Sequence, residues 1–321
     1  MTNSAPKPKL EEQSLPPTFA NAGNPKLWLY FGVWVVLSFL LFWRPVYEIV
    51  RLALQDETSS HILLVPLISA WLLYWERSNT EAASNYKNGW AMAFLVSAIV
   101  LAVFHSYCNS CSPRDRLSIY ASSLILLLVA GFIGILGTAK ARASFFGLGF
   151  LILGIPIPDA VLRRIIYWLQ SGSAEISEFF FNLSSAPVLR EGFIFRLPRI
   201  SVEVAQECSG IRSSLALLIL ALLVAHFSFR PLWKKVVFVF IGICMMLLKN
   251  GIRIVSLTLL ANYVNPEFLY GKLHHQGGVV FFLIGLVLLL PVYWLLRKGE
   301  EAPAKGGQTQ RSVRFESDSV H

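Results

Sequence analysis

Charged residues are scarce in this sequence. Asp, Glu, Lys and Arg make up 15% of the 321 residues, whereas hydrophobic residues make up 55%, and a soluble globular protein usually carries about 25% charged residues. This scarcity excludes an ordinary soluble globule. The apolar residues also gather in blocks of the roughly 17 to 25 residues that a helix needs to cross a bilayer. The sequence therefore predicts an integral membrane protein.

Cysteine is scarce as well, with four residues in the chain. Cys108 and Cys111 lie in one short loop near His105, but a structural zinc site needs a fourth ligand and the sequence has no second cysteine pair. We therefore expect no metal site, and either an external disulfide bond or two free thiols in this loop. Cys244 lies inside an apolar run, which is typical of an inert core residue.

Several functional signatures are missing altogether. The chain has no phosphate-binding loop, no dinucleotide fingerprint and no internal repeat, so we expect no cofactor. The net charge of +9 does not require a nucleic acid, because basic cytoplasmic loops that face anionic lipid explain much of it. Membrane lipid is thus an expected partner, nucleic acid is not, and the sequence indicates no particular oligomeric state.

The apolar blocks predict about eight transmembrane helices in an all-α membrane protein. They cover residues 27–43, 61–75, 90–107, 117–137, 143–157, 209–228, 233–249 with a continuation to 263, and 275–296. We expect a single polytopic membrane domain over 27–298, between disordered cytoplasmic tails at 1–26 and 299–321. The first block is not expected to be a cleaved signal peptide, because a polar tail precedes it and no small-residue cleavage site follows.

Lysine and arginine placement orients this bundle in the cell (inner or plasma) membrane. With eight crossings, both tails and the loops at 76–87, 140–142 and 230–235 fall on one side, which the positive-inside rule makes cytoplasmic. The loops with Arg44, with Arg114 and at 158–207 are then external. These loops also carry positive charge, so not every loop follows the rule.

The external segment 158–207 is the only sizeable part expected outside the membrane. Two prolines at its start end a helix, and an amphipathic stretch then suits an interfacial helix. Further along, apolar residues alternate with others on both sides of Pro198: Phe193, Phe195 and Leu197 before it, and Ile200, Val202 and Val204 after it. This alternation predicts a short β-hairpin that turns at Pro198 and leads to Cys208, directly before the sixth span.

Polar residues of three segments are expected to share the external face. Cys208 opens the sixth span, Arg253 lies near the outer end of the seventh, and His274 and His275 open the eighth. A helix N-terminus and a guanidinium favour a thiolate, although the adjacent Glu207 opposes this unless it points away. A histidine can take the thiol proton and give it to a leaving amine. Arginine stays protonated and can stabilise the thiolate or an oxyanion.

Simpler explanations exist for each residue. A cysteine in an apolar setting is more often inert, and an arginine at a span end often reaches for lipid headgroups. However, a charge within a span costs roughly 2.5 to 3.5 kcal/mol on insertion scales, so Arg253, between apolar neighbours, indicates a function.

Three motifs together are more specific. Glu-Cys-Ser-Gly-Ile-Arg at 207–212, Asn-Gly-Ile-Arg at 250–253 and His-His-Gln-Gly-Gly at 274–278 resemble the signatures of the exosortase and archaeosortase family. These are multispanning membrane cysteine transpeptidases proposed to process exported proteins of the PEP-CTERM type. The resemblance implies that Cys208 is the nucleophile, Arg253 the cationic stabiliser and His274 the proton carrier. The alternative or accessory residues are His275, Asn250 and Arg212.

The same resemblance implies a substrate and a product. The substrate is an exported protein with a C-terminal sorting signal made of a short Pro-containing motif, a hydrophobic helix and a basic tail. Attack by Cys208 gives a thioester, which an amine or water releases.

Two other classes remain open at this point. In a transporter, Arg253 and His274 would line a polar path, but such a site should lie near the midplane of the membrane between broken helices. A membrane acyltransferase would use the same cysteine on a lipid or a glycan.

Overall fold

The computed structural model describes residues 25–76, 88–107, 111–204, 211–270 and 278–298. They are mainly helical, with three short strands. The chain divides into two compact units, Met1–Val161 and Leu162–His321, and each is described by itself. The single membrane domain expected over 27–298 stays a prediction, and the two expected tails lie outside the described residues except for Pro25 and Lys26.

The all-α membrane class is confirmed. By length and composition, five described helices can cross a membrane, or up to seven if each of two bent helix pairs is one span. The expected number of eight spans stays a prediction.

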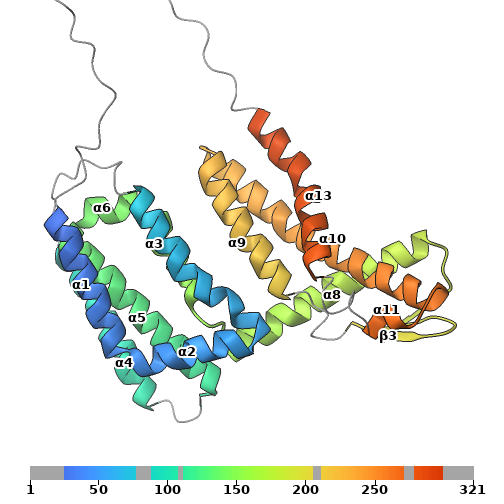
Figure 1. Ribbon diagram of the computed structural model, residues 1–321, viewed down its shortest axis with the longest axis horizontal. Coiled ribbons are helices and arrows are strands. Elements are labelled where there is room, and N and C mark those ends of the chain that lie inside the picture. Colours follow the sequence, from blue (N-terminus) through green and yellow to red (C-terminus); the bar gives the residue numbers. More distant parts are fainter. Residues whose placement is uncertain (1–24, 77–87, 108–110, 205–210, 271–277, 299–321) are drawn as a thin grey trace, which may run out of the picture. The chain divides into compact units, whose positions relative to one another are not determined.

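Unit 1 contains seven α-helices and two short 3₁₀ segments among its described residues, before the start of α8 (Figure 1). They are α1 (Pro25–Leu41), α2 (Trp43–Gln55), η1 (Glu57–Leu63), α3 (Leu64–Glu76), α4 (Asn88–Tyr107), α5 (Pro113–Leu136), α6 (Thr138–Ala143), α7 (Phe145–Phe150) and η2 (Leu151–Gly154). The axes of α1 and α2 differ by 80°. The first span is therefore broken after Leu41.

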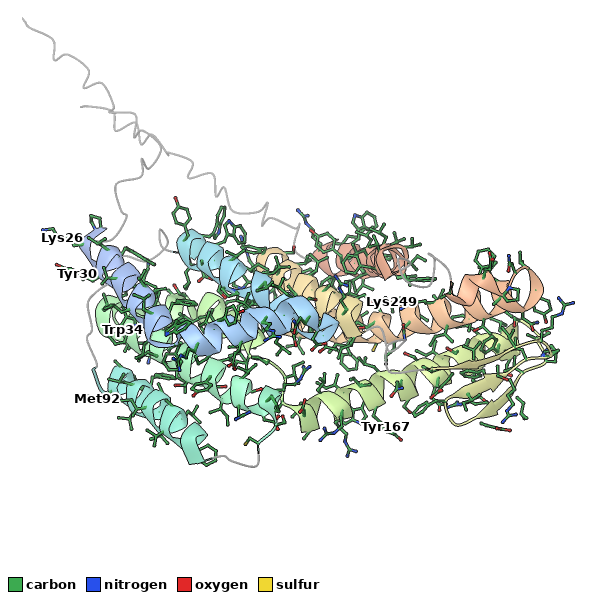
Figure 2. All side chains as sticks on the ribbon, turned by 60° about the horizontal axis from the view of Figure 1, so that its bottom comes forward. Lys26, Tyr30, Trp34, Met92, Tyr167 and Lys249 are labelled. Atoms are coloured by element: carbon green, nitrogen blue, oxygen red, sulfur yellow. The ribbon has the colours of Figure 1, made fainter. Side chains whose placement is uncertain are left out.

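Helix α5 packs against both α1 and α4. It begins where the Ser112 hydroxyl accepts a hydrogen bond from the Asp115 N–H, and it ends at Gly137, whose φ of 88° suits glycine. The Trp34 indole N–H on α1 donates to the Leu127 carbonyl at 3.0 Å (Figure 2). Gly131 makes room for this ring, because a Cβ there would lie 2.1 Å from the Trp34 Nε1.

The segment expected to be the fifth span differs from a straight crossing. Helix α7 and η2 together cover Phe145–Gly154, about 15 Å of helix, and bend by 92° into α8 (Asp159–Leu183). Pro156 and Pro158 have no N–H to continue the helix. The Ser118 hydroxyl donates to the Pro156 carbonyl at 2.6 Å, which fixes the bend.

Arg114 ties three segments of unit 1 together at this bend. Its guanidinium forms ion pairs with Asp56, at the start of η1, and with Asp159, at the start of α8. Asp56 also accepts hydrogen bonds from the Thr58 N–H and hydroxyl. Burial raises the pKa of the Asp56 carboxyl, but the hydrogen bonds from Thr58 and Arg114 outweigh burial and hold the pKa below its ordinary value.

Unit 2 holds most of α8, a small sheet and four further helices among its described residues. These are β1 (Leu189–Glu191), β2 (Ile194–Arg196), β3 (Ser201–Glu203), α9 (Ile211–Ser228), α10 (Leu232–Tyr263), α11 (Glu267–Tyr270) and α13 (Gly278–Lys298). Helices α9, α10 and α13 pack on one another. Ala221 and Gly242 allow α9 and α10 to approach closely, since a Cβ on Gly242 would lie 3.3 Å from the Ala221 Cβ.

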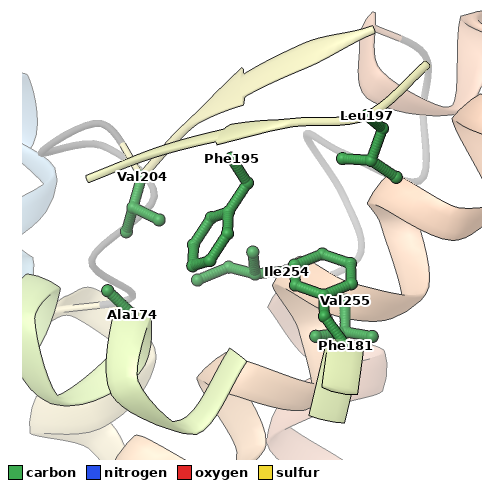
Figure 3. Packing of buried hydrophobic residues seen from close by; sticks show 7 residues of the cluster. All are labelled: Ala174, Phe181, Phe195, Leu197, Val204, Ile254 and Val255. Carbon is green, nitrogen blue, oxygen red and sulfur yellow. The ribbon is translucent and has the colours of Figure 1, made fainter. Parts of the chain in front are cut away.

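The sheet has three antiparallel strands in the order β1, β2, β3. Phe195 pairs with Val202 across β2 and β3, and the Leu197 N–H donates to the Ile200 carbonyl next to the turn at Pro198. The sequence predicted two strands here and did not predict β1. The apolar face of the sheet packs on α8 and α10, where Phe195, Leu197 and Val204 contact Ala174, Phe181, Ile254 and Val255 (Figure 3).

Candidate active site

Half of the candidate site residues lie in the described part of unit 2. Arg212 is the second residue of α9, and Asn250 and Arg253 lie on α10. Cys208, between β3 and α9, and His274 and His275, between α11 and α13, lie outside the described residues.

Asn250 fastens α10 to α8. Its side chain is 2% exposed, and the amide nitrogen donates to the Ser173 hydroxyl at 2.9 Å. One turn along α8, the Ser177 hydroxyl donates to the Ser173 carbonyl and lies 3.5 Å from the Gly251 carbonyl. The helices meet so closely because Gly251 has no side chain, since a Cβ there would lie 2.4 Å from the Ile176 Cγ2. Backbone contact and a polar pair therefore hold this stretch of α10 in place.

Lys249 lies beside Asn250 and is almost fully buried, at 1% exposure (Figure 2). Its ammonium group donates to the Ser213 hydroxyl on α9 at 2.5 Å. Gly285 on α13 leaves space for the lysine stem, because a Cβ there would lie 3.3 Å from the Lys249 Cδ. Helices α9, α10 and α13 therefore surround the side chain of Lys249.

Two basic side chains lie close together in this region. Arg253 lies one helical turn from Lys249 on α10, and the two positive charges interact. Ser213, the partner of Lys249, is in the first turn of α9, where the helix N-terminus adds partial positive charge. In the part of the chain that the structure describes, Lys249 has a hydroxyl partner and no carboxylate partner. Buried positive charge without a carboxylate stabilises a negative group nearby.

The sheet is fixed to α8 on the side that leads to the nucleophile candidate. The Gln170 side chain on α8 donates to the Val204 carbonyl at 2.9 Å, four residues before Cys208. Arg190 on β1 forms ion pairs with Glu175 and Glu178 on α8 and lies over the Phe195 ring. The hydrogen bond to Glu175, together with that to Glu178, raises the pKa of Arg190 above its ordinary value.

Sequence reasoning missed the polar side chains that support Asn250 and Arg253. The seventh span was expected over 233–249 with a continuation to 263, and α10 does end at Tyr263. The sequence did not indicate that Lys249, within this helix, is buried. The polar residues of α8 that face its neighbours are spaced three and four apart, at Gln170, Ser173 and Ser177. That spacing was available as a signal, but it resembles the solvent face of an interfacial helix.

The loop of Cys108 and Cys111, which was considered as a metal site, belongs to unit 1. Cys111 is disulfide-bonded, which is one of the two alternatives expected for its loop. Among the residues that the structure describes, no group of three His, Cys, Asp or Glu side chains could hold a metal ion.

Comparison with known proteins bears on this arrangement. A family model described as transmembrane exosortase (Exosortase_EpsH) matches residues 50–291. No curated protein matches the chain, and neither does any solved structure.

Proposed function

Because the chain belongs to the transmembrane exosortase family, we propose that it is a membrane cysteine transpeptidase that cleaves the C-terminal sorting signals of exported proteins. Membership supports the general class directly: a multi-pass membrane protein that sorts exported proteins as a transpeptidase or protease. The matched region contains all six candidate site residues.

The observation that carries the proposal is the positive, tightly braced stretch of α10 at residues 249–253. Cys208 is the nucleophile, and its thiolate is stabilised by Arg253, by Lys249 and by the N-terminus of α9. Asn250 and its Ser173 partner hold α10 so that both cations keep their places. His274 carries the proton, with His275 as the alternative, and Arg212 is an accessory cation.

The reaction follows from these roles. The Cys208 sulfur attacks the scissile carbonyl carbon, a C–S bond forms, and the charge on the oxygen is stabilised by Arg253. The C–N bond then breaks while the imidazolium of His274 gives its proton to the leaving amine. An acceptor amine or water, deprotonated by His274, attacks the thioester, so that the C–S bond breaks and the thiolate returns.

The length of α10 supports a site at the membrane surface. If α10 enters the membrane at Leu232, Arg253 lies about 32 Å along the helix, and the hydrocarbon core is about 30 Å thick. The last ten residues of α10 then project beyond the core. This stretch contacts the sheet through Ile254 and Val255, and the Asn262 amide oxygen accepts a hydrogen bond from the Arg199 N–H. A transporter site near the midplane fits this position less well.

We assign this surface to the external face of the inner or plasma membrane, with both termini in the cytoplasm. The disulfide bond of Cys111 supports the orientation, because disulfides persist outside the reducing cytosol and the eight-span topology puts the 108–111 loop on the side of residues 158–207. In a protein whose Cys208 and Cys244 are replaced by alanine, a cysteine introduced at exposed Ser201 should therefore react with a membrane-impermeant maleimide in intact cells. One at Arg230 should react only after permeabilisation, and the reverse pattern would overturn the orientation.

The substrate is an exported protein that ends in a short Pro-containing motif, a hydrophobic helix and a basic tail. Its helix lies in the membrane beside the bundle, and its motif reaches Cys208 at the external surface. The test is co-expression with such a substrate, with processing measured by mobility shift and mass spectrometry. Cys208→Ala, Arg253→Ala and His274→Ala should abolish processing.

The control for the nucleophile is Cys244→Ala. The sequence led us to expect Cys244 in the core, but it is a free cysteine exposed on the surface of α10, and it should be dispensable. His275→Ala separates the two histidines. Processing that survives Cys208→Ala would show that the nucleophile is wrong.

A further inference from the structure

Unit 1 contains an apolar cavity of about 530 Å³ that has no part in the proposed chemistry. Its wall is built from α1, α2 and η1, α3, α5, α7 and η2. Helix α1 packs on α5 and α3 packs on α7, and the cavity lies between α1 and α3, over α5. In Figure 1, α5 is seen between α1 and α3 within unit 1. Gly32 on α1 and Gly154 at the end of η2 are part of the wall and keep it open.

The side chains that form the wall offer few hydrogen-bond partners to water. Of the side chains that line the cavity, only those of Trp28, Ser69 and Tyr74 contain a polar atom. A bound water needs two to four polar partners, and this wall supplies too few of them. The occupant must therefore be apolar itself.

The lining residues give the length of the cavity. They run from 28 to 39 on α1 and from 65 to 74 on α3, which are lengths of about 17 Å and about 14 Å. The cavity is therefore a slot about 15 Å long between the two helices.

The same dimensions match one acyl chain. A cavity of about 150 Å³ holds the six carbons of benzene, so 530 Å³ holds about twenty carbon atoms. The length of about 15 Å is also half of the roughly 30 Å hydrocarbon core, which is the depth of one leaflet. Unit 1 lies in a membrane, where acyl chains are the most concentrated apolar molecules.

One end of the slot suits a headgroup. Trp28 and Tyr74 line this end, and such aromatic side chains favour the boundary between headgroups and hydrocarbon. Figure 2 shows Lys26 and Tyr30 at the same end of α1. A lysine at the level of the headgroups attracts the negatively charged phosphate of a lipid.

From these observations we propose that the cavity of unit 1 is a binding site for one acyl chain of a membrane phospholipid, with the phosphate near Lys26. The acyl chain fills the space between α1 and α3. This inference does not depend on the transpeptidase function.

The test measures bound phospholipid by native mass spectrometry of the full-length protein in a mild detergent. Gly32→Leu fills the slot without a backbone clash, because a Cβ at Gly32 meets nothing within 4 Å. Gly149→Leu is the matched control, since Gly149 is also helical, has nothing within 4 Å of a Cβ, and is not part of the wall. Wild type and Gly149→Leu should each retain one phospholipid, whereas Gly32→Leu should lose it at least fivefold.

A second measurement needs no variant. A phospholipid with a photoreactive diazirine midway along one chain should label peptides from residues 25–41, 64–76 and 113–136 of the wild-type protein, and excess unlabelled phospholipid should reduce this labelling. Labelling spread evenly over the other helices, or equal retention by Gly32→Leu and Gly149→Leu, would overturn the proposal. Displacement of the labelled lipid by a peptide of the substrate's hydrophobic helix would also overturn it, in favour of a helix site.

Discussion

Lys249 and Arg253 are separated by one turn of α10, and their positive charges interact. Burial of a cation usually costs stability, and replacement of a buried charge by an apolar side chain of similar size is often neutral or stabilising. We therefore expect the charge of Lys249, which is 1% exposed, to serve the proposed anionic chemistry.

Lys249→Met keeps the length of the side chain and removes its charge. Processing should fall about tenfold or more, because an anion loses one of its stabilising groups, whereas the unfolding temperature should stay equal or rise. The pH at which half of the Cys208 thiol reacts with iodoacetamide should also rise. The unfolding temperature and the pH dependence of alkylation are both measured on the purified full-length protein.

Lys234→Met is the control for this variant. Lys234 is also buried on α10 and donates to the Leu296 carbonyl at the other end of the helix. The Lys234→Met variant should process the substrate as well as wild type does, and the pH dependence of Cys208 alkylation should be unchanged. A Lys249→Met protein with normal processing would contradict the electrostatic role.

Asp56 gives a pH dependence of stability. Its pKa is lower in the folded protein than the ordinary value of 3.8, so its contribution is complete above that value and is lost as the pH falls through the folded pKa. As the pH falls below about 4, the unfolding temperature of wild type should drop more steeply than that of Asp56→Asn. The variant should already be several degrees lower at pH 7. Parallel curves would contradict the role of the Arg114 ion pair.

The sequence predicted some of these residues and missed others for a physical reason. Arg253 stands between apolar neighbours, so its cost of insertion was visible from composition alone. Lys249 was not singled out because its burial depends on the helices that pack around α10. The hydroxyl of Ser213 and the space at Gly285 come from other helices, and no local pattern reveals them.

Helices α8 and α10 form the element that carries the candidate site. They approach closely at Gly251, and Asn250 and Ser173 form a hydrogen bond beside the crossing. Alternation of apolar residues predicted strands on both sides of Pro198, because a sheet with one buried face has a period of two. Strand β1 has the sequence Leu-Arg-Glu, which contains no alternation of apolar residues, so its pairing was not predictable.

Gly251→Ala should separate these helices. The new Cβ would lie 2.4 Å from the Ile176 Cγ2, and overpacking of this kind costs about 1–3 kcal/mol. The unfolding temperature and processing should both fall, and a second change, Ile176→Ala, should restore them in part. Gly134→Ala is the control, since its Cβ would lie 3.7 Å from the Ala91 Cβ, an ordinary contact. Equal stability of the two alanine variants would refute the close crossing.

At the scale of the whole molecule, composition and block length predicted the all-α membrane class correctly. They could not predict where spans break. The 80° bend after Leu41 lies near the end of the apolar run, and Pro45 accounts for part of it, because proline has no N–H to donate to the Leu41 carbonyl. The bend before Asp159 was partly visible from Pro156 and Pro158, but its effect on the number of spans was not.

The central claim is that Cys208 forms a thioester with an exported substrate. The most direct measurement is to quench the reacting protein in acid, digest it with trypsin and weigh the peptide of residues 200–212, which contains Cys208. We expect this peptide to carry the new C-terminus of the substrate, to lose it in hydroxylamine and never to gain it when Cys208 is alanine. An adduct on another residue, or cleaved substrate from Cys208→Ala, would contradict the account.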